Sequence, residues 1–168
     1  FVGSEVFVDQ HLLVRGRFAR MIPAMMAKGY QIGLGIDEDS AMVVNAQREV
    51  EIIGYKGAML IDLTRAETDK ENPLFNVKNA VISYLDRGDK FNIGTRMFMP
   101  SSDKAGGRLD PTRPLGRGAV FSNDVLGNSA VVDLMERLID SDQEEAIGIA
   151  SGNPRTDKTE TGFEFRFT

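Results

Sequence analysis

The pattern of apolar and polar positions along the chain indicates short strands and two helices. Apolar residues at helical spacing predict a first helix over residues 12–28, where Pro23 predicts a kink or an early end and Gly29 a stop. A second, amphipathic helix is predicted over 128–140. Its expected apolar face consists of Val131, Leu134, Met135, Leu138 and Ile139. Strands are predicted over 5–9, 31–36, 41–45, 50–54, 58–63, 76–85, 146–150 and 162–168.

The order of these elements predicts the fold class. Strands and helices alternate early in the chain, and a meander of antiparallel-looking strands follows. This order favours an α/β fold with a partly parallel open sheet flanked by helices, and we expect 1–168 to form a single domain. Residues 99–118 are rich in Pro, Gly, Ser and charge, which predicts a mobile surface loop. Its basic residues, expected in solvent, are Lys104, Arg108, Arg113 and Arg117.

Composition and charge narrow the range of functions. The chain of 168 residues is 42% hydrophobic and 27% charged, which is ordinary for a globular domain with its own core. A formal net charge of −5 gives no reason to expect nucleic acid as a partner. The absence of cysteine excludes a disulfide framework and thiolate chemistry in this chain. No apolar run reaches the length that spans a membrane.

Positive charge is concentrated in one stretch of this acidic chain. Residues 10–36 contain no Asp or Glu, yet Arg15, Arg17, Arg20 and Lys28 fall there. Such an island indicates either a local site for an anion or the solvated face of a helix.

The single histidine lies at the end of the first predicted strand, in Asp9-Gln10-His11. Asp37 and Glu38 follow another strand. Functional groups of open α/β sheets gather beyond the carboxyl ends of strands, so neighbouring strands would bring an acid to His11. The acid would orient one ring nitrogen while the other faces substrate, as in two-thirds of a nucleophile–base–acid relay. The alternative is a surface histidine beside a solvated basic helix.

No serine nucleophile is recognisable in the chain. The G-x-S-x-G turn of serine hydrolases is absent, and Ser129 in the nearest segment, 127–131, is expected to cap a helix. The chemistry therefore either needs no protein nucleophile or takes one from outside this chain. Gly33-Leu34-Gly35 is expected to serve packing or a turn rather than to bind a nucleotide. The acids at 37–39 could hold only a hard cation, and calcium-loop spacing is missing.

Three groups of residues together resemble the cyanophycinase family, which comprises serine exopeptidases related to peptidase E. They are Asp9-Gln10-His11, then Arg15-Gly16-Arg17 with Arg20, then the segment 33–38, and the similarity continues through 81–91. It covers about residues 6–96 and fades beyond Met99. The family degrades cyanophycin, a poly-aspartate carrying arginine on each β-carboxyl, to β-Asp-Arg dipeptides.

The resemblance implies a flavodoxin-like, class I glutamine amidotransferase-like fold, of which 1–168 would be the C-terminal part. It implies that His11 is the catalytic base and Glu38 its orienter, although Asp37 or Asp39 could share the second role. The implied substrate pocket contains Asp9, Gln10, Arg15, Arg17 and Arg20, with at least one arginine structural. No cofactor and no metal are implied.

The resemblance also implies partners. The family's serine lies upstream of the Asp-Gln-His motif, and the chain begins Phe1-Val2-Gly3-Ser4 without methionine, so we expect a fragment or one chain of a processed pair. The expected partners are the N-terminal half of the same protein and a peptide rich in Asp and Arg, with a homodimer as a further family trait. Neither nucleic acid nor a membrane is expected. The alternatives are an isoaspartyl or aspartyl dipeptidase and a non-catalytic protein that binds acidic peptides.

Overall fold

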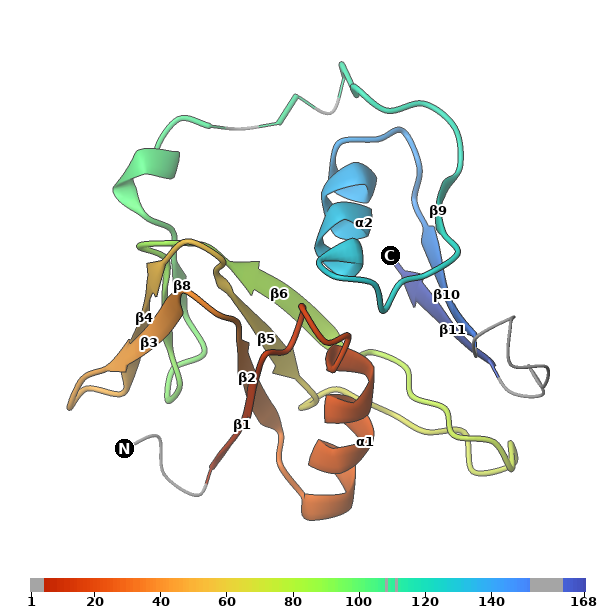
Figure 1. The fold of residues 1–168 in the computed structure, drawn as a ribbon, viewed down its shortest axis with the longest axis horizontal. Helices are drawn as coiled ribbons and strands as arrows, with labels where there is room; N and C mark the ends of the chain where they lie inside the picture. The colour runs from red at the N-terminus through yellow and green to blue at the C-terminus, as the bar shows by residue number, and fades with distance from the viewer. Residues whose placement is uncertain (1–4, 108, 111, 152–161) are drawn as a thin grey trace. The chain divides into compact units, whose positions relative to one another are not determined.

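The computed structural model describes residues 5–107, 109–110, 112–151 and 162–168, and the chain forms two compact units (Figure 1). Unit 1 comprises residues 1–12 and 17–105, and unit 2 comprises 13–16 and 106–168. That all 168 residues form one domain stays a prediction.

Unit 1 contains two four-stranded sheets. In the first, β1 (Val6–Gln10) runs parallel to β2 (Ile32–Ile36), and β5 (Ala58–Asp62) and β6 (Val81–Leu85) continue the sheet in antiparallel fashion. The second sheet is fully antiparallel, with the order β3 (Ser40–Val44), β4 (Glu49–Gly54), β7 (Lys90–Asn92) and β8 (Phe98–Met99). The α/β class, the partly parallel sheet and the antiparallel meander are confirmed, and they are consistent with a flavodoxin-like peptidase fold.

Alternate residues of both sheets form the hydrophobic core of unit 1. On β2, Ile32 and Leu34 are almost fully buried, and they point to the same face because alternate residues of a strand share a face. Each such side chain contributes about 1.5–3 kcal/mol to folding. The complete cluster consists of Val6, Ile32, Leu34, Val50, Ile52, Ala58, Leu60, Leu85, Phe91 and Ile93.

The two glycines of β2 allow other residues to pack against the opposite face of this strand. A Cβ atom at Gly33 would lie 2.3 Å from Met21 Cε and 2.5 Å from Met25 Sδ. At Gly35 it would lie 2.2 Å from Leu12 Cδ2. The expected packing role of this Gly-Leu-Gly segment is confirmed, because side chains of the protein itself occupy the space beside both glycines.

Helix α1 (Phe18–Lys28) begins six residues later than predicted. Residues 12–16 form turns instead, in which the Arg17 N–H donates to the Leu12 carbonyl (2.6 Å) and the Gly16 N–H to the Leu13 carbonyl (3.0 Å). Gly16 has φ +58°, a left-handed conformation that interrupts any helix and that glycine adopts at little cost.

The end of α1 matches the prediction. Gly29 is left-handed (φ 75°), its N–H donates to the Met26 carbonyl (3.2 Å), and the Tyr30 N–H donates to the Met25 carbonyl (2.9 Å). These two bonds form a Schellman motif, which satisfies carbonyls at the helix terminus. Pro23 lies inside the helix without ending it.

Unit 2 has a three-stranded sheet with the order β11 (Gly162–Phe167), β10 (Ala146–Ser151) and β9 (Val120–Ser122). β10 is parallel to β9 and antiparallel to β11, and helix α2 (Ala130–Ile139) packs against β9 and β10.

The apolar face of α2 is rotated from the predicted one. Val131, Val132 and Leu134 are buried, whereas Ile139 is 66% exposed, so its assignment to the buried face was wrong. Ser129 occupies the N-cap position with φ 60° and makes no capping bond. The prediction of a capping side chain was therefore wrong, because the hydroxyl donates instead to Asn128 Oδ1 (3.2 Å).

Short strands and the basic loop show further differences. Only 81–85 of the predicted strand 76–85 is a strand, and β7, β8 and β9 were not predicted. The segment after β8 contains a 3₁₀ turn, η1 (Ser102–Lys104). Lys104, which was expected to be solvated, forms an ion pair with Asp89. Arg113 and Arg117 are exposed as predicted, and Arg108 lies outside the described residues.

Within the part of the chain that the structure describes, no helix has the length and apolar character needed to cross a membrane.

Candidate active site

The site is built on two neighbouring parallel strands of unit 1. β1 and β2 pair in register from Val6 with Ile32 to Gln10 with Ile36, so their carboxyl ends meet at one edge of the sheet (Figure 1). His11 follows β1 directly, and Glu38 follows β2 by two residues. The expectation that neighbouring strands bring an acid to the histidine is confirmed by the resulting ion-pair distance.

His11 and Glu38 form a close but imperfectly aligned pair. The imidazole Nδ1 lies 3.2 Å from Glu38 Oε1, and the side chains are 37% and 48% exposed. The Nδ1 atom itself is buried, and none of the described residues offers it an aligned hydrogen bond. Catalytic hydrogen bonds are often misaligned before substrate binds, and the catalytic roles of both residues stay predictions. His11 also has φ 52°, which is uncommon for a residue with a side chain.

A lysine that sequence reasoning missed stands on the far side of Glu38. Lys56 Nζ lies 3.8 Å from Glu38 Oε2 and 4.0 Å from Asp39 Oδ2. Lys56 belongs to the turn between β4 and β5, and the β2–β5 register pairs Ile36 with Ala58. Knowledge of this antiparallel pairing would have placed the turn beside the acids, but the pairing cannot be inferred from the turn residues alone.

Asp9 organises a second charged cluster at the end of β1. Arg20 donates to its carboxylate through Nε (3.3 Å to Oδ2) and Nη2 (3.2 and 3.1 Å to Oδ1 and Oδ2). Arg17 Nη1 donates to the Gln10 carbonyl (2.9 Å) and lies 3.7 Å from Asp9 Oδ1. The Asp9 side chain is only 12% exposed. Both guanidinium groups therefore connect the start of α1 to the end of β1, and their contact with substrate stays a prediction.

The other predicted site residues differ in their surroundings. Gln10 and Arg15 are exposed, and Arg15 belongs to unit 2. Asp37 is buried at the end of β2, whereas the Asp39 side chain is 73% exposed. Glu38 is thus the acid that the structure brings to His11, and the roles of all these residues remain predictions.

Within residues 5–107, 109–110, 112–151 and 162–168, no group of three or more His, Cys, Asp or Glu side chains could hold a metal ion.

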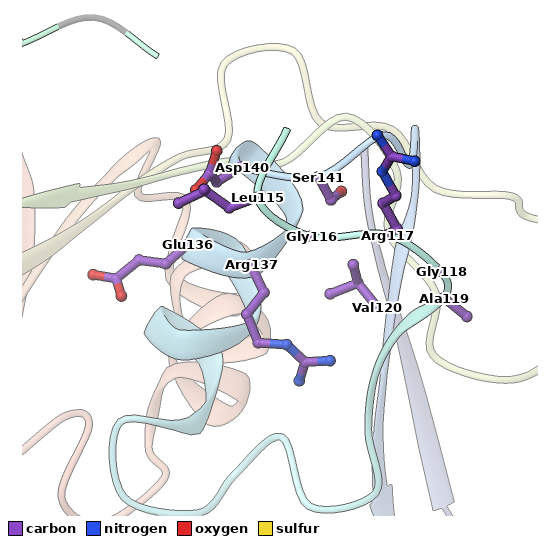
Figure 2. Close-up of a pocket in the computed structure, with 10 residues that line it drawn as sticks. All are labelled: Leu115, Gly116, Arg117, Gly118, Ala119, Val120, Glu136, Arg137, Asp140 and Ser141. Atoms are coloured by element: carbon purple, nitrogen blue, oxygen red, sulfur yellow. The ribbon is translucent and has the colours of Figure 1, made fainter. Parts of the chain in front are cut away.

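Unit 2 contains a hollow of about 320 Å³, at the lower end of the range for small-molecule sites (Figure 2). It lies between the end of α2 and the segment before β9. Its two guanidinium groups, of Arg117 and Arg137, extend in different directions, and Arg137 donates to the Phe121 carbonyl (3.3 Å). None of the site residues predicted from the sequence lines it. The lining residues are Leu115, Gly116, Arg117, Gly118, Ala119, Val120, Glu136, Arg137, Asp140 and Ser141.

Comparison with known proteins identifies relatives of part of this chain. It is 31% identical over 102 residues to a cyanophycinase of Trichormus variabilis. The aligned residues make up 58% of this chain and 34% of the relative. It is 32% identical over 101 residues to a cyanophycinase of Geminocystis herdmanii (56% and 37%), and 32% identical over 97 residues to one of Synechococcus elongatus (54% and 30%).

No protein-family model matches the chain. The chain spans about a third of the length of the curated relatives it matches. The resemblance to the cyanophycinase family that the motifs indicated is nevertheless confirmed over the matched part of the chain.

Proposed function

We propose that this chain supplies the base, its orienter and part of the substrate pocket of a serine-type peptidase that hydrolyses cyanophycin to β-Asp-Arg dipeptides. The observation that carries the proposal is the approach of Glu38 Oε1 to His11 Nδ1 beyond the ends of β1 and β2. The cyanophycinase relatives support the choice of reaction and substrate.

In the proposed reaction, Glu38 accepts the Nδ1–H of His11, so that the lone pair of Nε2 faces the nucleophile. Nε2 takes the proton of a serine hydroxyl as the serine oxygen bonds to the scissile carbonyl carbon. The imidazolium then gives that proton to the leaving amine, and the C–N bond breaks. Water then gives a proton to the same Nε2 as its oxygen bonds to the acyl carbon. The bond from that carbon to the serine oxygen breaks, and the imidazolium returns the proton to the serine.

The serine itself is proposed to lie on a segment outside these 168 residues, in the same protein. The chain has no serine-hydrolase turn, and the matched 97 to 102 residues make up only about a third of each relative. That segment is therefore the principal proposed partner.

Charge complementarity supports a substrate that presents carboxylates and guanidinium groups in alternation. Gln10 and Arg15 are exposed, and Arg20 remains 59% exposed although it binds Asp9. Exposed guanidinium edges can clamp a substrate carboxylate through two parallel bonds.

The test is turnover of cyanophycin by the complete protein that carries this chain, compared with its His11→Ala and His11→Asn variants. Asparagine tolerates the positive φ of residue 11, so the second variant separates lost chemistry from backbone strain. We expect both variants to lose at least about 10²–10⁴-fold in turnover while binding of the polymer is largely kept. Normal turnover in either variant would overturn the proposal.

The substrate panel separates the alternatives. Hydrolysis of short isoaspartyl peptides without attack on the polymer would favour a dipeptidase. Binding of acidic peptides by a wild-type protein that hydrolyses neither substrate would favour a non-catalytic binding protein.

A further inference from the structure

The contacts of Lys56 point to a role in the same site. We infer that Lys56 is a positioning residue, which holds the Glu38 carboxylate so that Oε1 faces His11. This inference rests on the proposed function for its catalytic meaning. Lys56 touches neither the imidazole nor, in the proposed reaction, the substrate.

The three side chains form a chain of contacts. His11 Nδ1 lies 3.2 Å from Glu38 Oε1, and Lys56 Nζ lies 3.8 Å from Glu38 Oε2. A carboxylate is planar, so restraint of one oxygen restricts where the other can lie. Without a cation on its outer side, the half-exposed Glu38 side chain would be free to rotate into solvent and move Oε1 away from the buried Nδ1 atom.

Three hydrogen bonds hold the backbone around Lys56. The Lys56 N–H donates to Ser40 Oγ (2.8 Å), and the Tyr84 hydroxyl donates to the Lys56 carbonyl (2.9 Å). The neighbouring Tyr55 N–H donates to the Asp39 carbonyl (2.9 Å). These bonds connect the turn to the segment that carries the acids and to β6, so the origin of the lysine side chain is fixed relative to Glu38.

Gly57 allows the close approach of the Tyr84 hydroxyl. Its φ is +62°, and a Cβ atom there would lie 2.5 Å from Tyr84 Oη. A side chain at this position would disturb the bond to the Lys56 carbonyl.

The alternative is that Lys56 is an ordinary solvent-exposed lysine that lies near Glu38 and Asp39 without positioning either. Its side chain is 46% exposed, and ion pairs between exposed groups contribute little to stability. A stability measurement therefore cannot decide between the two roles. The protonation site of the imidazole can, because the hydrogen bond at one ring nitrogen determines which nitrogen carries the proton.

The experiment is ¹⁵N NMR of histidine-labelled complete protein at a pH where the imidazole is neutral. The signal that disappears in His11→Asn identifies residue 11. We expect wild type to carry the proton mainly on Nδ1, and Lys56→Met to shift the population toward Nε2–H. Lys56→Arg should restore the wild-type pattern, and Lys70→Met, which removes another exposed lysine of unit 1, should not change it. An unchanged tautomer in Lys56→Met, or an equal shift in Lys70→Met, would overturn the inference.

Kinetics then separate this inference from the proposed function. If both hold, Lys56→Met lowers kcat by about 10- to 100-fold with little change in KM, as expected when a catalytic group is misplaced. A tautomer shift in Lys56→Met together with full activity in His11→Asn would contradict the proposed function and leave the positioning of Glu38 supported. Loss of activity in His11→Asn with no tautomer shift in Lys56→Met would contradict only the inference.

Discussion

Asp9 and His11, two residues apart at the end of β1, differ in how many hydrogen bonds their side-chain atoms make. The Asp9 carboxylate is mostly buried and accepts hydrogen bonds from Nε and Nη2 of Arg20, with Arg17 nearby. The His11 imidazole is partly exposed, and its buried Nδ1 has an acid at 3.2 Å without an aligned hydrogen bond. Fully bonded charges support a fold, whereas an incompletely bonded titratable group in a partly exposed position is available for chemistry.

The contacts of Asp9 change the interpretation of the basic stretch 10–36. Residues 10–36 lack acids, but Asp9 immediately precedes them and meets Arg20 in space. Part of the predicted anion site is therefore occupied by an anion of the protein itself. Arg15, the third arginine of this stretch, is exposed and belongs to unit 2.

The largest expected effect is that of Glu38→Gln on turnover by the complete protein. Loss of the negative charge beside Nδ1 should lower kcat by about 10²–10⁴-fold, the contribution typical of acid–base catalysis. Asp39→Asn is the matched control, since the Asp39 side chain is 73% exposed and contacts Lys56 rather than His11. Equal losses of kcat in both variants would show that Glu38 and Asp39 act jointly, and would contradict the claim that Glu38 alone orients His11.

The next effect concerns stability. Arg20→Met leaves the mostly buried Asp9 carboxylate without its Nε and Nη2 donors, which should lower the free energy of unfolding by about 1–3 kcal/mol. Urea denaturation measures this change, and Arg65→Met provides a control at an exposed arginine of the same unit. Two equally small changes would mean that the Asp9 cluster is no more structural than a surface ion pair.

Asp89 extends the comparison to a second buried carboxylate. It accepts hydrogen bonds from Lys104 Nζ (2.5 Å) and from the N–H groups of Ser101 (2.9 Å) and Asp86 (2.8 Å). Burial raises the pKa of Asp89, but these hydrogen bonds and the charge of Lys104 outweigh it, so the pKa lies below its usual value.

A carboxyl whose pKa is lowered by folding stabilises the protein above its unfolded pKa of about 3.9 and loses that effect as pH falls through the lower, folded value. We therefore expect Asp89→Asn to lower unfolding free energy by about 1 kcal/mol or more at pH 7, with the difference from wild type shrinking below about pH 4. Urea denaturation from pH 7 to 3 measures it, with Asp103→Asn as a control for the same segment. A difference that persists undiminished at pH 3 would contradict the assignment to the carboxylate charge.

The smallest expected effect is that of Arg15→Ala. An exposed guanidinium that contacts only substrate should leave the urea midpoint unchanged and raise KM by about 3- to 10-fold, equivalent to one hydrogen bond. A lowered urea midpoint with unchanged KM would show that Arg15 stabilises the fold, as Arg20 is expected to do, and does not bind substrate.

The elements that depend on local sequence were predictable, and those that depend on distant pairing were not. Gly29 ends α1 where expected, and the glycines at 33 and 35 serve packing, because both roles follow from the absence of a Cβ atom. The start of α1 was missed because the apolar spacing of residues 12–16 suits a helix, while Gly16 adopts a left-handed turn.

Side-chain partnerships show the same limit. The motif order indicated the His11–Glu38 pair, since both residues follow strands that turned out to be neighbours. Lys56 and Lys104 gave no sequence signal, because each reaches its acid through strand pairing and turns that bring together residues 15 or more positions apart. Three-residue strands such as β7 and β9 are likewise too short to show alternation.

The central claim is that His11 activates a serine supplied by the rest of the protein. Labelling of the complete protein with a fluorophosphonate tests it without a substrate, since this reagent bonds covalently to activated serines. Mass spectrometry of the labelled peptide should place the adduct on one serine outside these 168 residues, and labelling should be lost in His11→Asn. The absence of an adduct in the wild-type protein, or equal labelling of wild type and His11→Asn, would contradict the claim.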